Sequence, residues 1–192
     1  MSRTLFAMVV ALLLATSAAA QDTWQIDPAH SSAQFAIRHL GISTVRGAFT
    51  KVSGSAHFDP VDPNKASVQA VIDTASVDTR VEARDKDLRS PRFFDVQKYP
   101  TITFKSTKVE AAGEGKLRVT GDLTIHGVTK DVVLDVDGPS APMKDPGGNM
   151  RIGASATTTI NRQDFGVTAG SGMVGDQVTI TLDVEMSKPA GK

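Results

Sequence analysis

Apolar and polar residues alternate along most of the chain beyond residue 30. The alternation is clearest in 117–125 and 178–186, where every second residue is apolar or glycine. A period of two is typical of a β-strand that buries one face and exposes the other to water. The pattern predicts eight strands, at residues 31–39, 45–58, 66–73, 101–110, 116–126, 130–137, 150–160 and 177–187.

The two faces of these strands differ, which favours antiparallel pairing, because strands of a parallel sheet are buried on both faces and are apolar throughout. We therefore expect an all-β protein whose eight antiparallel strands close into a β-barrel. A β-sandwich is the alternative on pattern alone, because its strands alternate in the same way.

Residues 79–98 lack this alternation and predict a short helical insertion across one end of the barrel. Thr79 and Glu82 have the spacing of a capping box, and Ser90-Pro91 is typical of the start of a second turn. Arg84 lies in this charged segment with Asp85 and Asp87. Its guanidinium either binds a polar group of a ligand or, together with Asp85, fastens the insertion to the barrel.

The N-terminus begins with one basic residue, Arg3, followed by an apolar run and small residues up to Ala20. This is the pattern of a cleaved signal peptide, residues 1–20, so we expect an exported protein with one domain at 21–192. No later apolar run is long enough to predict a transmembrane segment in the mature protein.

Charge and cysteine content exclude several classes of partner and chemistry. The chain has 21 basic and 21 acidic residues, and removal of Arg3 leaves 20 − 21 = −1, so no basic excess indicates nucleic acid as a partner. Cysteine is absent, which excludes thiol chemistry. The four histidines, at 30, 39, 57 and 126, lack zinc-site spacing, so we expect no metal and no cofactor.

Small residues recur at inward positions, at Ala33, Gly47, Ala56, Ala70, Gly121, Ala154 and Ala156. A barrel of eight strands either fills its interior or holds one ligand, and small inward residues favour an apolar pocket. The predicted wall consists of Phe35, Ile37, Phe49, Phe58, Ile72, Phe104, Leu123, Ile125, Phe165 and Ile180. His39 and Arg84 are the candidates for contact with a ligand head group. The alternative is that the small residues only allow close packing in a filled core.

Several motifs together resemble the YceI-like family, in order along nearly the whole mature chain. They include Trp24-Gln25-Ile26-Asp27-Pro28-Ala29-His30-Ser31, Phe93-Phe94-Asp95-Val96-Gln97-Lys98-Tyr99-Pro100, and Asn161-Arg162-Gln163-Asp164-Phe165-Gly166. The resemblance implies a lipocalin-like barrel in the bacterial periplasm that encloses a long-chain isoprenoid lipid or isoprenoid quinone. One position departs from the family pattern: Asp87 stands where a histidine is usual, which puts the head-group contacts in question.

Binding, transport or sequestration of such a lipid, held non-covalently, is therefore the function that the sequence favours, without catalysis. One rival is a secreted structural or stress-related interaction module with a filled core. Another is an enzyme that acts on a lipid, with Asp85 or His39 as acid or base. A homodimer through an exposed strand edge or loop is compatible with each of these functions.

Overall fold

The computed structural model describes residues 23–58 and 62–189, so the predicted signal peptide at 1–20 lies outside the described residues. The strands are β1 (Thr23–Ile26), β2 (Ser32–His39), β3 (Ser43–Phe49), β4 (Val52–His57), β5 (Ser67–Asp73), β6 (Val77–Asp78), β7 (Thr101–Ala111), β8 (Lys116–Ile125), β9 (Val128–Asp137), β10 (Met143–Lys144), β11 (Asn149–Asn161) and β12 (Val174–Pro189). The helical elements are η1 (Pro63–Lys65), η2 (Thr74–Ser76), α1 (Glu82–Arg89) and η3 (Arg162–Phe165).

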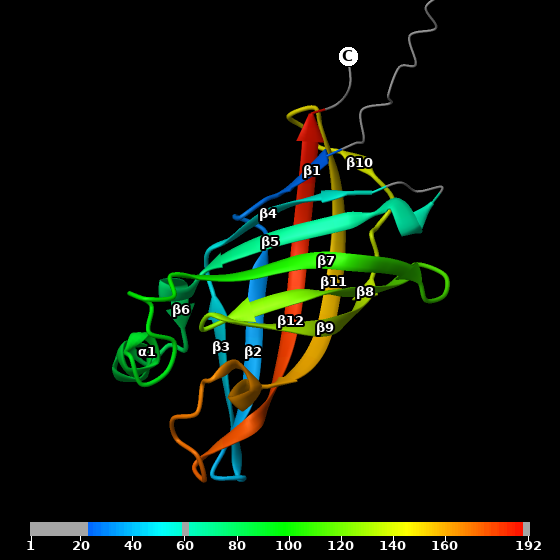
Figure 1. Cartoon of the computed structure of the whole chain (residues 1–192). Coiled ribbons are helices and arrows are strands. Elements are labelled where there is room, and N and C mark those ends of the chain that lie inside the picture. The colour runs from blue at the N-terminus through cyan, green and yellow to red at the C-terminus, as the bar shows by residue number, and fades with distance from the viewer. Residues whose placement is uncertain (1–22, 59–61, 190–192) are drawn as a thin grey trace, which may run out of the picture.

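The strands form one antiparallel sheet that closes into a barrel (Figure 1). Eight strands make the ring, in the order β11-β9-β8-β7-β5-β4-β1-β12, and the pairing of β11 with β12 closes it. Strands β2, β3 and β6 extend the sheet below the ring along the lower part of β12. The predicted fold class is confirmed.

Strands β2 and β3 connect directly to two strands of the ring. Strand β2 follows β1 and pairs with the same neighbour, β12, and β3 leads into β4. The predicted single strand 45–58 is broken at Thr50 and Lys51, whose N–H groups donate to the carbonyl and hydroxyl oxygens of Ser76. This contact with η2 comes from a distant part of the chain, so local alternation does not reveal the break.

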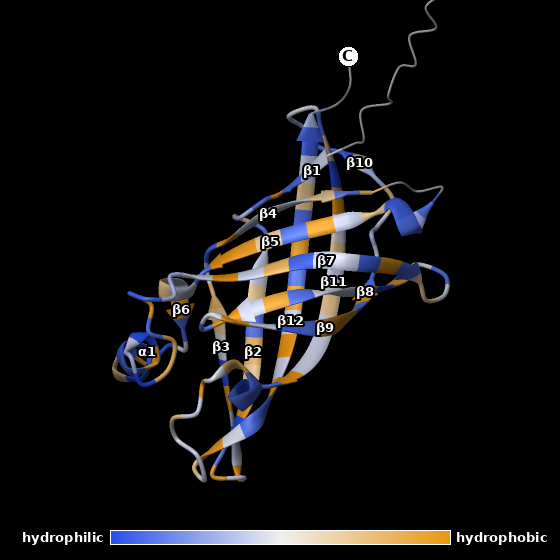
Figure 2. Cartoon of the chain, viewed as in Figure 1, coloured by the Kyte–Doolittle hydropathy of each residue, from blue (hydrophilic) through white to orange (hydrophobic). Residues whose placement is uncertain are grey.

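Alternation along the strands appears as alternating hydropathy in Figure 2. In β8, Val119, Gly121, Leu123 and Ile125 are buried, while the residues that alternate with them are partly or fully exposed. The buried face joins a core that runs from Trp24 to Phe165.

The insertion consists of α1 and the turns that follow it, and it packs against the core through Leu88, Phe93 and Phe94. The expected capping box is wrong. Helix α1 begins after Val81, without a side-chain cap, and Thr79 instead donates from its N–H and hydroxyl to Asp85 Oδ1, at 2.8 and 2.5 Å. No helix within residues 23–58 and 62–189 has the length and apolar character needed to cross a bilayer.

Candidate ligand cavities of the barrel

Two apolar cavities lie inside the molecule, end to end. The barrel cavity, of about 190 Å³, is lined mainly by the strands of the ring. The insertion cavity, of about 140 Å³, is lined by the insertion, by η3, and by residues of β2, β3, β7, β8, β11 and β12. Ile102, Leu123 and Ile180 line both cavities and form a waist between them. The two cavities therefore adjoin at these three side chains within one apolar interior.

All ten predicted wall residues line these cavities. The barrel cavity takes Phe58, Ile72 and Phe104, the insertion cavity takes Phe35, Ile37, Phe49, Ile125 and Phe165, and Leu123 and Ile180 face both. Their contact with a lipid stays a prediction.

Small residues act in two different ways. Ala56, Ala70, Ala154 and Ala156 line the barrel cavity directly, and Ala33 lines the insertion cavity. The glycines instead make room for aromatic rings. A Cβ at Gly47 would lie 2.5 Å from Phe35 Cζ, and a Cβ at Gly121 would lie 2.6 Å from Phe104 Cζ. These glycines therefore shape the wall by letting a phenylalanine of the neighbouring strand lie over the backbone.

The insertion supplies wall residues that the sequence argument missed, namely Leu88, Phe93 and Phe94. Phe94 packs edge-on against Phe49, with ring centroids 5.6 Å apart, and Phe49 packs against Phe35 at 5.8 Å. The tandem phenylalanines beside Pro91 were the available signal, because two large apolar side chains in a charged segment need a surface to cover.

The two candidate head-group residues do not line these cavities. His39 is exposed at the end of β2. Arg84 donates from Nε to Thr79 Oγ1 at 2.8 Å and from Nη2 to Thr79 O at 3.0 Å. The contacts of Arg84 fasten the insertion, which was one of the two expected roles, and contact of either residue with a head group stays a prediction.

Arg162 is a buried cation beside the insertion cavity, with 5% of its surface exposed. Its guanidinium donates to Val167 O at 2.6 Å, Ala169 O at 2.7 Å and Gly175 O at 2.9 Å. Hydrogen bonds to several backbone carbonyls offset the cost of burying the charge. Arg162 thus fixes the loop after η3 against β12 and supports the cavity wall at Phe165.

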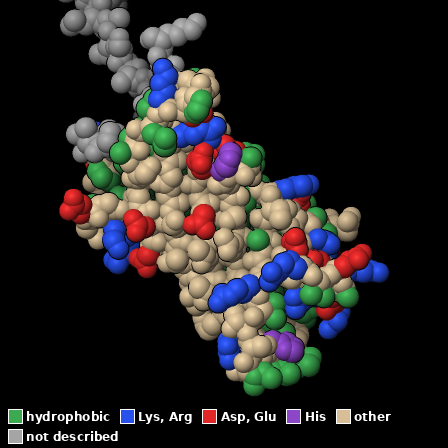
Figure 3. Space-filling view, turned by 180° about the vertical axis from the view of Figure 1, so that it is seen from behind, with side chains coloured by type: hydrophobic (Ala, Val, Ile, Leu, Met, Phe, Trp, Pro, Cys, Tyr) green, Lys and Arg blue, Asp and Glu red, His purple; other side chains and the backbone are tan. Residues whose placement is uncertain are grey.

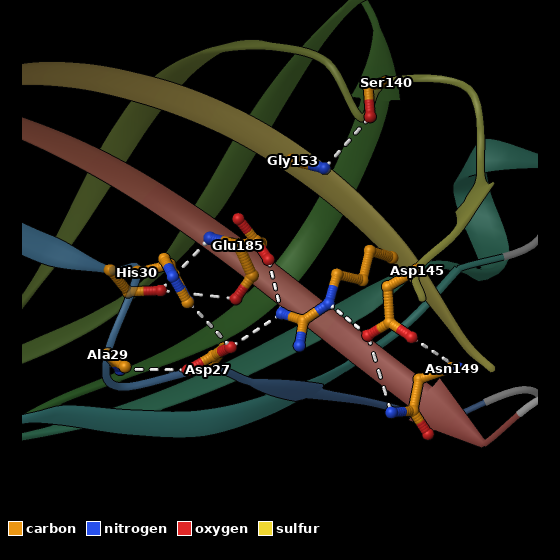
Figure 4. A network of polar contacts seen from close by, with 10 residues as sticks. Asp27, Ala29, His30, Ser140, Asp145, Asn149, Gly153 and Glu185 are labelled. Carbon is orange, nitrogen blue, oxygen red and sulfur yellow. Dashed lines mark hydrogen bonds and ion pairs between the residues drawn. The ribbon is translucent and has the colours of Figure 1, made fainter. Parts of the chain in front are cut away.

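A polar network lies on the outside of the barrel, where β1, β11 and β12 meet (Figure 4). Arg151 donates to Asp27 and Asp145, at 2.7 Å each, and to Glu185, and Asp27 also contacts His30 Nδ1 at 3.0 Å. Hydrogen bonds from Arg151 hold the pKa of Asp27 well below its usual range, and they also lower the pKa of Asp145.

The same network contains the one group of possible metal ligands found among the described residues. Ligand atoms of Asp27, His30 and Glu185 lie within 4.8 Å of one another. The guanidinium of Arg151 already bonds two of the three side chains, so it supplies the positive charge that these carboxylates need. Arg151 on β11 thus holds Asp27, after β1, and Glu185 on β12 together, and we call this network the clamp between strands.

Comparison with known proteins gives one family. The YceI-like domain matches residues 24–186. A UPF0312 protein of Vibrio cholerae is 41% identical over 170 residues, which cover 87% of this chain and 89% of that protein.

Solved structures agree. BcnA of Burkholderia cenocepacia has a TM-score of 0.74 and 28% identity, covering 83% of this chain and 98% of that one. A polyisoprenoid binding domain from Saccharophagus degradans, implicated in plant cell wall breakdown, has a TM-score of 0.62 and 19% identity over 86% of this chain and 98% of that one, which shows a shared fold. With its closed barrel, its cavities and a match over nearly all described residues, the chain belongs to the YceI-like family.

Proposed function

We propose that this protein binds a long-chain isoprenoid lipid or isoprenoid quinone, non-covalently, along the barrel cavity and the insertion cavity. As a periplasmic protein it would transport or sequester that lipid. The observation that carries the proposal is the pair of adjoining apolar cavities that share the wall residues Ile102, Leu123 and Ile180. The Saccharophagus domain, described as binding polyisoprenoid, has the same fold and supports this choice of ligand.

Burial of the tail supplies the affinity in this proposal. The lining is apolar, and the one charged lining side chain, Arg162, directs its guanidinium to backbone carbonyls. Each buried CH₂ group contributes about 0.8 kcal/mol, so a tail of roughly a dozen carbons binds tightly without a polar contact. Water gains little in such a space, because it finds no hydrogen-bond partners there.

The rival functions have less support. A filled-core module requires an interior without cavities of this size. An enzyme requires an acid or base that faces its substrate, whereas Asp85 is held by Thr79 and His39 lies outside both cavities. We therefore propose binding rather than catalysis.

The test is a series of prenyl alcohols of increasing length, offered to delipidated protein from cyclodextrin and measured by displacement of a fluorescent apolar probe. Affinity should rise about fourfold for each additional buried CH₂ group until the tail fills both cavities, and then level off. Failure of every chain length to displace the probe would exclude the proposal. A dependence on the head group alone, with no effect of length, would exclude it equally.

A further inference from the structure

An exposed apolar tip lies at one end of the molecule, formed by the β2–β3 turn and the loop before β12. Seven large hydrophobic side chains are exposed among the described residues, and three of them lie here: Leu40, Ile42 and Met173, at 53%, 79% and 54% exposure. The N–H of Leu40 donates to Met173 O at 2.7 Å, so the two loops form one surface. Figure 3 shows hydrophobic side chains gathered at this end, at the bottom of the view. A cluster of apolar side chains exposed to solvent marks an interaction site.

The turn presents these side chains from a fixed and strained backbone. Ile42 N–H donates to His39 O at 3.1 Å, and the two central residues, Leu40 and Gly41, have φ of 50° and 69°. Glycine adopts this left-handed conformation freely, but leucine does so at a steric cost. Arg38 stiffens the turn through bonds to Gly41 O at 2.6 Å and Thr44 Oγ1 at 2.9 Å. A leucine in this position gains nothing for folding from its exposed side chain, which favours a role in binding.

The loops of the tip carry no acidic residue. Residues 28–58 and 165–175 contain no aspartate or glutamate, and the acidic residue that follows on β12, Asp176, accepts hydrogen bonds from Arg162 and Gln163. Arg38 and Arg46 are exposed on the strands that lead to the turn. Apolar residues at the end of a basic, acid-free segment match an anionic phospholipid surface, where the apolar residues enter the boundary and the arginines meet the head groups.

The tip lies beside the insertion cavity. Val174 follows Met173 directly and lines that cavity, and Ile37 on β2 lines it three residues before Leu40. The strands that carry the exposed tip therefore also supply part of the wall of the proposed lipid site.

We propose that this tip docks the protein on an anionic phospholipid bilayer, with Leu40, Ile42 and Met173 inserted, so that the insertion cavity faces the membrane from which lipid enters. The role in lipid entry rests on the proposed function, whereas docking itself is measured independently of any bound lipid.

The experiment measures sedimentation of the protein with vesicles of phosphatidylethanolamine and phosphatidylglycerol, and with vesicles of phosphatidylcholine alone. The double variant Ile42→Ser/Met173→Gln should lower partition into the anionic vesicles about tenfold. Met143→Gln is the matched control, because Met143 is 63% exposed on β10, away from the tip, and it should leave partition unchanged. Arg46→Gln should weaken binding to the anionic vesicles only, and added salt should do the same.

Prenyl-alcohol uptake from cyclodextrin is measured on the same variants, and the double variant should retain it. If the unsubstituted protein takes up no prenyl alcohol but binds the vesicles, the proposed function is excluded and docking remains in place. Docking is overturned if the unsubstituted protein does not sediment with anionic vesicles, or if Met143→Gln lowers partition as much as the double variant. It is also overturned if the double variant only converts a dimer to a monomer in analytical ultracentrifugation, because the tip would then bind a second copy of the chain.

Discussion

The ring of Phe104 on β7 lies directly over the backbone of Gly121 on β8, so that a Cβ at position 121 would lie 2.6 Å from Phe104 Cζ. Phe104 lines the barrel cavity, and the same Cβ would lie 2.5 Å from Lys105 O, so both the ring and the β7 backbone approach closely because Gly121 has no side chain. Gly47 and Phe35 repeat the relationship beside the insertion cavity.

Gly121→Ala should destabilise the protein by about 1–3 kcal/mol, because the added methyl group forces the ring or the strand to move. Gly153→Ala on β11 is the matched control. Its Cβ would meet nothing closer than Val184 O at 3.8 Å, and its effect should stay within about 0.5 kcal/mol. Urea denaturation measures both, and equal effects would show that the contact does not constrain the barrel.

Leu123→Trp should separate the two cavities by filling the waist that Leu123 forms with Ile102 and Ile180. Long prenyl alcohols should lose affinity by at least about tenfold, while short ones that fit in one cavity keep theirs. Val133→Trp, on an exposed position of β9, is the control for a new tryptophan on the barrel. If Leu123→Trp weakens short and long chains alike, the waist is not the passage between the cavities.

Asp85→Ala should destabilise the insertion, because Asp85 is 6% exposed and accepts two hydrogen bonds from Thr79. Loss of a hydrogen bond to a charged group costs about 1.5–3 kcal/mol. Asp87→Ala removes only an exposed ion pair with Arg92 and should cost less than about 1 kcal/mol. Hydrogen exchange of the α1 amides gives the comparison, and equal protection in both variants would contradict a structural role for Asp85.

Acid should weaken the clamp between strands. Arg151 holds the pKa of Asp27 below its usual value in the folded protein, so the stabilisation from Asp27 is complete above the ordinary carboxyl pKa, about 3.9, and is lost as the pH falls through the lower folded value. In thermal unfolding, the midpoint temperature should fall as the pH is lowered below about 4. Asp27→Asn should flatten this dependence, while Asp131→Asn, on an exposed position of β9, should follow the unsubstituted protein. An unchanged pH profile for Asp27→Asn would place the acid sensitivity elsewhere.

Alternation predicted the barrel because half-buried strands carry their burial pattern in the local sequence. It failed where structure depends on distant contacts or very short segments. The break at Thr50 and Lys51 arises from Ser76, and β6 has two residues, too few to show a period.

The cavity wall followed from the same argument, since inward positions are the alternate apolar ones, as at Leu123 and Ile125. Phe93 and Phe94 were missed because the insertion has no period to assign their direction. The exposure of His39 could not be foreseen either, because β2 continues past the ring of the barrel and its inward series ends outside the cavity.

The most direct test of lipid binding is mass spectrometry of organic extracts from protein purified without detergent from the cells that produce it. A stoichiometric long-chain isoprenoid or isoprenoid quinone, present in a smaller amount in extracts of Leu123→Trp, is the result that this account predicts. Protein that carries no such lipid, and that takes up none when delipidated, would contradict it.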